Sequence, residues 1–213
     1  MIEFLTYDLK VAVLIAVFYL FYRLMLARET FHHVNRLVLL LTAVASYVLP
    51  LCVITIHETV TIQRTANVAV GAWQAEAAVE QPAMPLWQIV LPILFIIGVA
   101  LTLCHTFWSL FRIIRLIKHS EQLPQEDGTI ICVTGNAALS PFSWMHYIVM
   151  NRSDYETNDA TVLAHERGHI SLRHSWDLIL VDTLTALQWF NPAMWMLRSD
   201  LRAIHEYEAD AAV

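Results

Sequence analysis

Two uninterrupted apolar runs limit what this chain can fold into. One covers residues 37–56 and the other covers residues 86–111, and neither contains a charged side chain. An α-helix needs about 20 mostly apolar residues to cross the hydrocarbon core of a bilayer, so both runs are long enough to span it. Each run contains one proline, Pro50 or Pro92, which spanning helices tolerate. We therefore predict membrane spans over both runs.

A third apolar segment, residues 7–25, is predicted to span the membrane as well, with Asp8 and Lys10 near the interface. No basic segment precedes it and no small-residue cleavage site follows it, which disfavours a signal peptide. The composition agrees, because 57% of the residues are hydrophobic and 15% are charged, against about 25% charged residues in a typical soluble domain. The net charge is −6 and no basic patch with interleaved aromatic residues occurs, so we expect no nucleic-acid partner.

Basic residues are distributed unevenly around these spans. The segment between the second and third spans, residues 59–85, contains a single Lys or Arg residue, Arg64. Loops rich in Lys and Arg stay in the cytoplasm. We therefore predict an N-terminus outside, an extracellular loop over 59–85, and a cytoplasmic region after the third span. The basic residues that flank the predicted cytoplasmic side are Arg23, Arg28, Arg36, Arg112, Arg115 and Lys118.

From residue 120 the pattern changes, which divides the chain into a transmembrane region, residues 1–119, and a cytoplasmic domain, residues 120–213. Residues 129–135 and 146–151 are short, rich in β-branched or apolar residues and bounded by turn residues, so they are predicted to be strands that form a small antiparallel sheet. The chain ends in "EADAAV" without a helix-ending signal, which predicts a truncated C-terminus.

Helices are expected after the sheet. Asn158 or Asp159 is a suitable N-cap for a helix that continues to about His174. The apolar stretch 176–197, which the Asn191–Pro192 pair interrupts, is predicted to be a helical hairpin that lies against the membrane or the preceding helix, and a last helix is predicted over about Pro192 to Ala212. A fourth span is the alternative, but carboxylates inside the stretch would be costly in lipid.

The motif "HERGH", residues 165–169, predicts a metal site. His165 and His169 lie four residues apart on one helix face, which is the spacing that a tetrahedral zinc ion needs from two imidazoles. Glu166 points about 100° around the helix, so it can remove a proton from an attacking water without binding the metal. This is the HExxH metalloprotease pattern. The alternative is a surface helix with incidental histidines.

A third ligand is expected from "IHEYEAD" near the C-terminus, because a catalytic zinc usually takes three protein ligands and one water. His205, Glu206 and Glu208 are all chemically suitable. Glu206 is favoured because Asp210 lies one turn further on the same face and can accept a hydrogen bond from a ligand imidazole. That bond would fix the tautomer and the orientation of the ring.

The combination of "SPFSW", "HERGH", "NPAMW" and "EYEAD" after several apolar segments resembles the BlaR/MecR-type membrane metallopeptidases, an antirepressor or signal-transducer family. The last motif also resembles the zinc-ligand motif of the CAAX-type and heat-shock membrane metallopeptidases. The resemblance implies that Glu206 is the third Zn²⁺ ligand and that Asp210 supports the ligand set. It implies that Glu208 is a solvated neighbour. It also implies an α+β, zincin-like cytoplasmic endopeptidase domain that cuts a cytosolic regulator or the protein itself in transmembrane signalling.

The remaining expectations concern supporting residues and partners. Arg202 and His146 are candidates to support the transition state or the substrate, with packing roles as the alternative, and His174 is expected to be solvated or to cap a helix. The expected partners are a peptide or protein substrate, in particular a cytosolic repressor, and the lipid bilayer, and a homodimer stays open. The rival functions are a non-catalytic zinc-containing signalling scaffold and a transporter, which the uncharged second and third spans disfavour. No S-x-x-K signature occurs, so the stimulus is not predicted.

Overall fold

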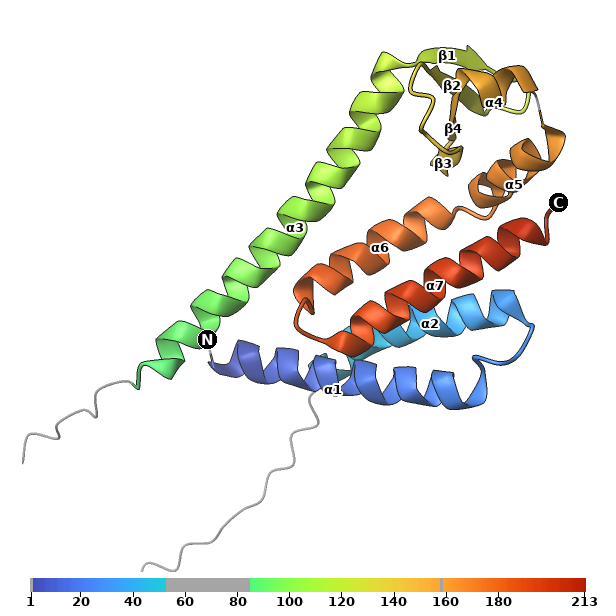
Figure 1. Ribbon diagram of the computed structural model, residues 1–213. Coiled ribbons are helices and arrows are strands. Elements are labelled where there is room, and N and C mark those ends of the chain that lie inside the picture. Colours follow the sequence, from blue (N-terminus) through green and yellow to red (C-terminus); the bar gives the residue numbers. More distant parts are fainter. Residues whose placement is uncertain (1, 53–84, 158) are drawn as a thin grey trace, which may run out of the picture.

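The computed structural model describes residues 2–52, 85–157 and 159–213, and Figure 1 shows their arrangement. The predicted extracellular loop therefore lies outside the described residues, apart from Pro85. In chain order the elements are α1 (Ile2–Met25), α2 (His32–Val48), the short 3₁₀ helix η1 (Leu49–Leu51), α3 (Trp87–His119), β1 (Glu121–Pro124), β2 (Ile130–Thr134), β3 (Phe142–Trp144), β4 (Tyr147–Asn151), α4 (Arg152–Thr157), α5 (Ala160–Ser171), α6 (His174–Leu187) and α7 (Pro192–Asp210).

Three helices in the described part of the chain are long and apolar enough to cross a membrane: Glu3–Met25, His32–Leu51 and Trp87–His119. They coincide with the three predicted spans, except that the end of the second prediction lies outside the described residues. The α-helical part of the second span ends before Pro50 and continues as η1. Large apolar side chains are exposed all around α3, as expected for a helix that contacts lipid. The insertion and its orientation stay predictions.

One apolar core joins the two ends of the chain. Figure 1 shows α1 and α2 lying beside α7, and α6 completes the same core. This core crosses the predicted boundary at residue 119, so the N-terminal helices and the C-terminal helices pack as one unit. Its fully or almost fully buried residues include Val11, Ile15, Leu39, Ala43, Val181, Met194, Leu197 and Leu201.

The apolar stretch 176–197 forms a helical hairpin, as the break at Asn191–Pro192 predicted, and consists of α6 and the start of α7. The chain turns between α6 and α7, and the Asn191 side chain caps α7 by accepting a hydrogen bond from the Ala193 backbone N–H at 3.0 Å. In the same turn, the Gln188 amide donates to the Asp8 carboxylate of α1 at 2.6 Å. These polar contacts hold the hairpin against the first helix, where burial without partners would be costly.

The sheet is mixed and four-stranded, with the order β1-β2-β4-β3, so the predicted antiparallel pairing was wrong. β2 and β4 run parallel, with Cys132 opposite Val149. The reason is that residues 142–144, which were expected to be loop, form the extra strand β3. β3 makes a tight antiparallel hairpin with β4, so β4 returns in the direction of β2.

Both faces of the sheet are covered. Ile131 and Ile148 pack toward Leu163 of α5 on one face, and Cys132 packs against Ile117 of α3 on the other. Burial on both faces explains why these strands are continuous apolar runs without alternation. The sheet therefore joins the end of α3 to α5 and places the edge strand β3 against α5.

Candidate metal centre

Helix α5 carries the "HERGH" motif and has a defined start and end. The Asp159 carboxylate caps it by accepting a hydrogen bond from the Thr161 N–H at 2.9 Å, in agreement with one of the two predicted N-caps. The helix ends at Ser171, earlier than expected, because Arg173 takes a left-handed conformation with φ 58°. His174 therefore belongs to α6 and turns back toward the motif.

Gly168 lets α5 and α7 approach closely. A Cβ atom at this position would lie 3.2 Å from the Ala212 Cβ and 3.3 Å from the Ala209 Cα. Both distances are tighter than ordinary van der Waals contact. The small residues on the two helices thus allow Glu206 of α7 to lie beside His165 and His169 of α5.

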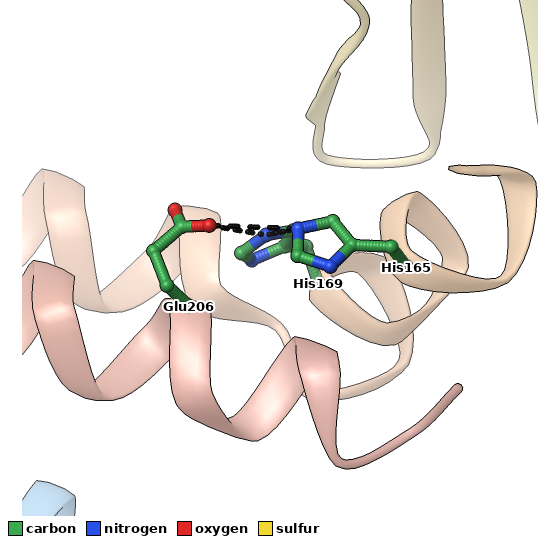
Figure 2. Close-up of side chains that lie close together, drawn as sticks. All are labelled: His165, His169 and Glu206. Atoms are coloured by element: carbon green, nitrogen blue, oxygen red, sulfur yellow. Dashed lines mark hydrogen bonds and ion pairs between the residues drawn. The ribbon is translucent and has the colours of Figure 1, made fainter. Parts of the chain in front are cut away.

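Three potential ligand atoms converge between these helices, as Figure 2 shows. The Nε2 atoms of His165 and His169 are 3.1 Å apart. The Oε2 atom of Glu206 lies 3.5 Å from the first of them and 3.9 Å from the second. A tetrahedral zinc ion with bonds of about 2.0–2.1 Å has ligand atoms about 3.3 Å apart. The triangle has the size that such an ion requires.

The tautomer of His165 follows from its partner. The Nδ1 atom of His165 lies 2.9 Å from Oδ1 of Asp210. An ionised carboxylate can only accept, so Nδ1 carries the proton and Nε2 presents a lone pair. The structure thus places Asp210 where the sequence predicts a support for the ligand imidazole.

The tautomer of His169 follows from a longer chain of contacts. Its Nδ1 atom lies 2.8 Å from Nδ1 of His174, and Nε2 of His174 lies 2.9 Å from Oε2 of Glu208. The carboxylate accepts from Nε2–H of His174, which leaves Nδ1 of that ring as an acceptor. His169 therefore donates from Nδ1, and its Nε2 also presents a lone pair. Burial lowers the pKa of His174 to about 4, which agrees with a neutral ring.

The donor set fits a metal ion. Two imidazole lone pairs and one carboxylate oxygen face one another, and no proton among these three groups remains to bridge them. Acceptors that converge in this way can bind a cation together, while water also reaches Glu206, whose side chain is 63% exposed. Two nitrogens and one oxygen also form the ligand set of known catalytic zinc sites, with a fourth position left for water.

Glu166 lies beside the triangle and is not part of it. It is 6% exposed, and burial raises the pKa of its carboxyl group, against the lowering effect of a hydrogen bond with Ser143. Ser143 is on β3 and faces α5, opposite to its neighbours Phe142 and Trp144. In the described part of the chain the Oε2 atom of Glu166 has no hydrogen-bond partner. The Glu166 side chain lines the cavity, and a carboxylate in that position can accept a proton from water.

A cavity of about 490 Å³ contains these groups. Helix α3 and strand β3 form one side, and α5, α6 and α7 form the other. The wall is apolar near Leu110 and Trp144, and it is charged near Asp182, Arg198 and Arg202. The candidate site therefore lies between the third apolar helix and the remaining helices.

The two candidates for transition-state or substrate support are placed differently. Arg202 lines the cavity, and its guanidinium lies 3.6 Å from Asp182. His146 is exposed and lies against the ring of Tyr147, with 4.0 Å between ring centroids. It is absent from the cavity wall that the described residues form. The structure therefore brings Arg202 to the site and leaves His146 outside it.

His174 and Glu208 are buried. This overturns the expectations that Glu208 is solvated and that His174 is solvated or caps a helix. They are 2% and 4% exposed, respectively. A periodic signal for Glu208 is present in the sequence, because Leu197, Leu201, Ile204 and Glu208 follow helical spacing along the buried face of α7. His174 has no comparable local signal, because its partners come from two other helices, α5 and α7.

The comparisons with known proteins give no identification: the chain matches no protein-family model and no curated protein. The likeness to the BlaR/MecR-type metallopeptidases therefore depends on the motifs alone.

Proposed function

We propose that the chain is an integral membrane zinc endopeptidase. The observation that carries this proposal is the triangle of unprotonated ligand atoms on His165, His169 and Glu206, 3.1–3.9 Å apart, beside the buried carboxylate of Glu166. A bound zinc ion supplies Lewis acidity that polarises a peptide carbonyl and makes a water molecule more acidic.

Glu166 is the general base and later the general acid of this proposal. Its carboxylate, which lines the cavity, accepts a proton from the attacking water, and the carboxyl group then delivers that proton to the leaving amine nitrogen. The hydrogen bond with Ser143 holds the carboxylate in place. The raised pKa that burial gives Glu166 makes it a stronger base than an exposed glutamate.

The substrate is an extended peptide. β3 is the outer strand of the sheet and also lines the cavity, so a peptide can add to its free edge beside Glu166. Phe142 and Trp144 offer apolar surface to its side chains. The guanidinium group of Arg202 lies further along the cavity wall, where it can contact a substrate carbonyl or carboxylate.

The cellular role in this proposal is transmembrane signalling in a bacterial cytoplasmic membrane, with the N-terminus outside and the candidate metal centre toward the cytoplasmic ends of α1 and α2. Three apolar helices and the uneven distribution of basic residues support this placement. The turn between α6 and α7 contacts Asp8 of α1, so these two helices pack along the proposed spans. Helix α3 leads from the predicted extracellular loop directly to the sheet and forms one wall of the cavity. The substrate is a cytosolic regulator, such as a repressor, or the protein itself.

The variant Glu166→Gln tests the proposal. We expect the purified variant to retain one zinc ion per chain by elemental analysis, because Glu166 is not a ligand. We expect proteolysis to fall by about 10²–10⁴-fold, because no base remains in place. Comparative proteomics of cells that make either protein should reveal a fragment that depends on Glu166. Zinc-loaded wild type that yields no such fragment, in cells or with peptide libraries, would contradict the proposal.

A non-catalytic signalling scaffold is the second candidate, and one observation favours it. Polar contacts through Glu208 and His174 join Arg36 of α2 to the candidate metal centre. A scaffold would use these contacts to transmit a movement of α2 to the zinc site, without cleaving a peptide. The same variant separates the two functions. Intact signalling by Glu166→Gln would favour the scaffold.

A further inference from the structure

A continuous series of polar contacts leads from the candidate ligand His169 to the second apolar helix. After His174 and Glu208, the next member is Arg36 of α2, whose Nη1 atom lies 3.3 Å from the Glu208 Oε2 atom. The guanidinium also donates to the Asp177 carboxylate at 2.6 Å and to the Leu172 carbonyl at 2.7 Å. One side chain of α2 thus contacts the end of α5, the start of α6 and the end of α7.

Burial makes these contacts interdependent. The side chain of Glu208 is 1% exposed and that of Arg36 is 17% exposed. A buried carboxylate is costly unless it is paired and hydrogen-bonded. Arg36 places a positive charge beside Glu208, and Nδ1 of His33 lies 2.6 Å from its other carboxylate oxygen. A carboxylate in this position accepts a hydrogen bond from His174.

The ring of His174 is also held on its faces. It stacks on the ring of His205, with 4.0 Å between centroids and 12° between planes. His205 is itself fixed by Asp177, whose Oδ2 atom lies 3.1 Å from its Nε2. His174 therefore has one orientation, in which Nδ1 faces His169 and Nε2 faces Glu208.

We propose that Arg36, Glu208 and His174 are positioning residues that connect α2 to the metal centre. They fix the proton of His169 on Nδ1, so that Nε2 is free to bind zinc, and they make zinc affinity depend on where α2 holds Arg36. The inference deepens the proposed function, because it assigns a means of control to the same site. If Arg36 and Glu208 only joined two helices, there would be no reason for His174 to contact both Glu208 and the candidate ligand His169.

The test is zinc affinity, measured by chelator competition on the full chain in detergent. His174→Phe keeps the stacking ring and removes the acceptor for His169. Glu208→Met removes the acceptor for His174. Each should weaken zinc binding by about 10–100-fold, as the loss of such supports does elsewhere. Glu208→Gln retains a carbonyl that accepts from His174, so its loss should be clearly smaller than that of Glu208→Met.

Two comparisons separate positioning from general stability. The double variant His174→Phe/Glu208→Met should bind zinc as His174→Phe does, because the effects of two substitutions in one series of contacts on zinc affinity are not additive. Arg23→Gln is the matched control for Arg36→Gln. Arg23 joins α1 to α7 through Asp200 at 3.1 Å and lies outside the series. Arg36→Gln should weaken zinc binding, and Arg23→Gln should not change it.

A second readout needs neither zinc nor proteolysis. Nitrogen-15 NMR of the imidazoles in metal-free protein should show His169 protonated on Nδ1 in the wild type and as mixed tautomers in His174→Phe. Wild-type zinc affinity in His174→Phe, or equal losses in Glu208→Gln and Glu208→Met, would overturn the inference. If wild type binds zinc but cuts no peptide, the proposed function fails while the affinity series still decides the inference.

Discussion

Single side chains determine which nitrogen of each histidine faces the metal position, and the two histidines are supported differently. Asp210, which contacts His165, has a side chain that is 69% exposed. Glu208, which acts through His174 on His169, is almost completely buried. Water competes with an exposed carboxylate for its partner, so we expect the Asp210 contact to contribute less than the buried series does.

Asp210→Ala should weaken zinc binding by about tenfold, at the low end of the range for such supports. The reason is that His165 loses the acceptor that keeps its proton on Nδ1. Asp210→Asn is the control, because its amide oxygen still accepts from Nδ1–H and should preserve most of the affinity. Chelator competition measures both variants, and an unchanged affinity in Asp210→Ala would show that water replaces the carboxylate fully.

The sequence allowed prediction of the residues whose relation is local. His165, Glu166 and His169 share one helix, and Asp210 lies one turn from Glu206. His174 could not be assigned in this way. Its neighbours are on α5, α7 and, through Glu208, α2, and tertiary packing of that kind leaves no periodic pattern in the sequence.

At the scale of elements, the spacing between α5 and α7 sets the width of the candidate site. Gly168→Ala should force these helices apart, because the added methyl group would meet the Ala209 backbone at 3.3 Å. We expect weaker zinc binding, although alanine is the better helix former by about 1 kcal/mol. Gly135→Ala is the matched control, since a Cβ there meets nothing within 4 Å. Equal zinc affinities in both variants would show that α7 adjusts without cost.

Element boundaries were easier to predict than strand directions. The apolar runs located the three long helices, and β-branched residues located β2 and β4. The sheet order was missed because β3 has only three residues, and a strand that short shows no alternation. β1, which lies in a polar segment without a strand signal, was also not predicted. The parallel pairing of β2 with β4 follows from β3.

At the scale of the whole molecule, the shared core makes the C-terminal half dependent on the N-terminal helices. We predict that residues 120–213 expressed alone will aggregate and will not bind zinc. Without α1 and α2, core residues of α6 and α7 such as Val181 and Leu201 lose their partners, at about 1.5–3 kcal/mol for each large side chain. Co-expression of residues 1–52 as a separate chain should restore part of the zinc binding. A soluble, zinc-binding fragment would contradict this.

The same packing could not be derived from hydropathy. An apolar helix that faces lipid and one that faces protein have similar composition, so the runs indicate length and not partners. The contacts that select the partners of α1 and α2 are few and polar, such as Tyr19 to Asp200 at 2.9 Å and Gln188 to Asp8. They join residues more than 170 positions apart.

The shared core also determines when the site can exist during protein synthesis. The ribosome delivers α1 and α2 to the membrane early, while Glu206, Glu208 and Asp210 emerge more than 150 residues later. Until then His165 and His169 lack their third ligand, and Arg36 lacks its carboxylate partners. Under the proposed function, we therefore expect that a nascent chain cannot cleave cytosolic proteins until α7 has been synthesised and has packed against α1 and α2.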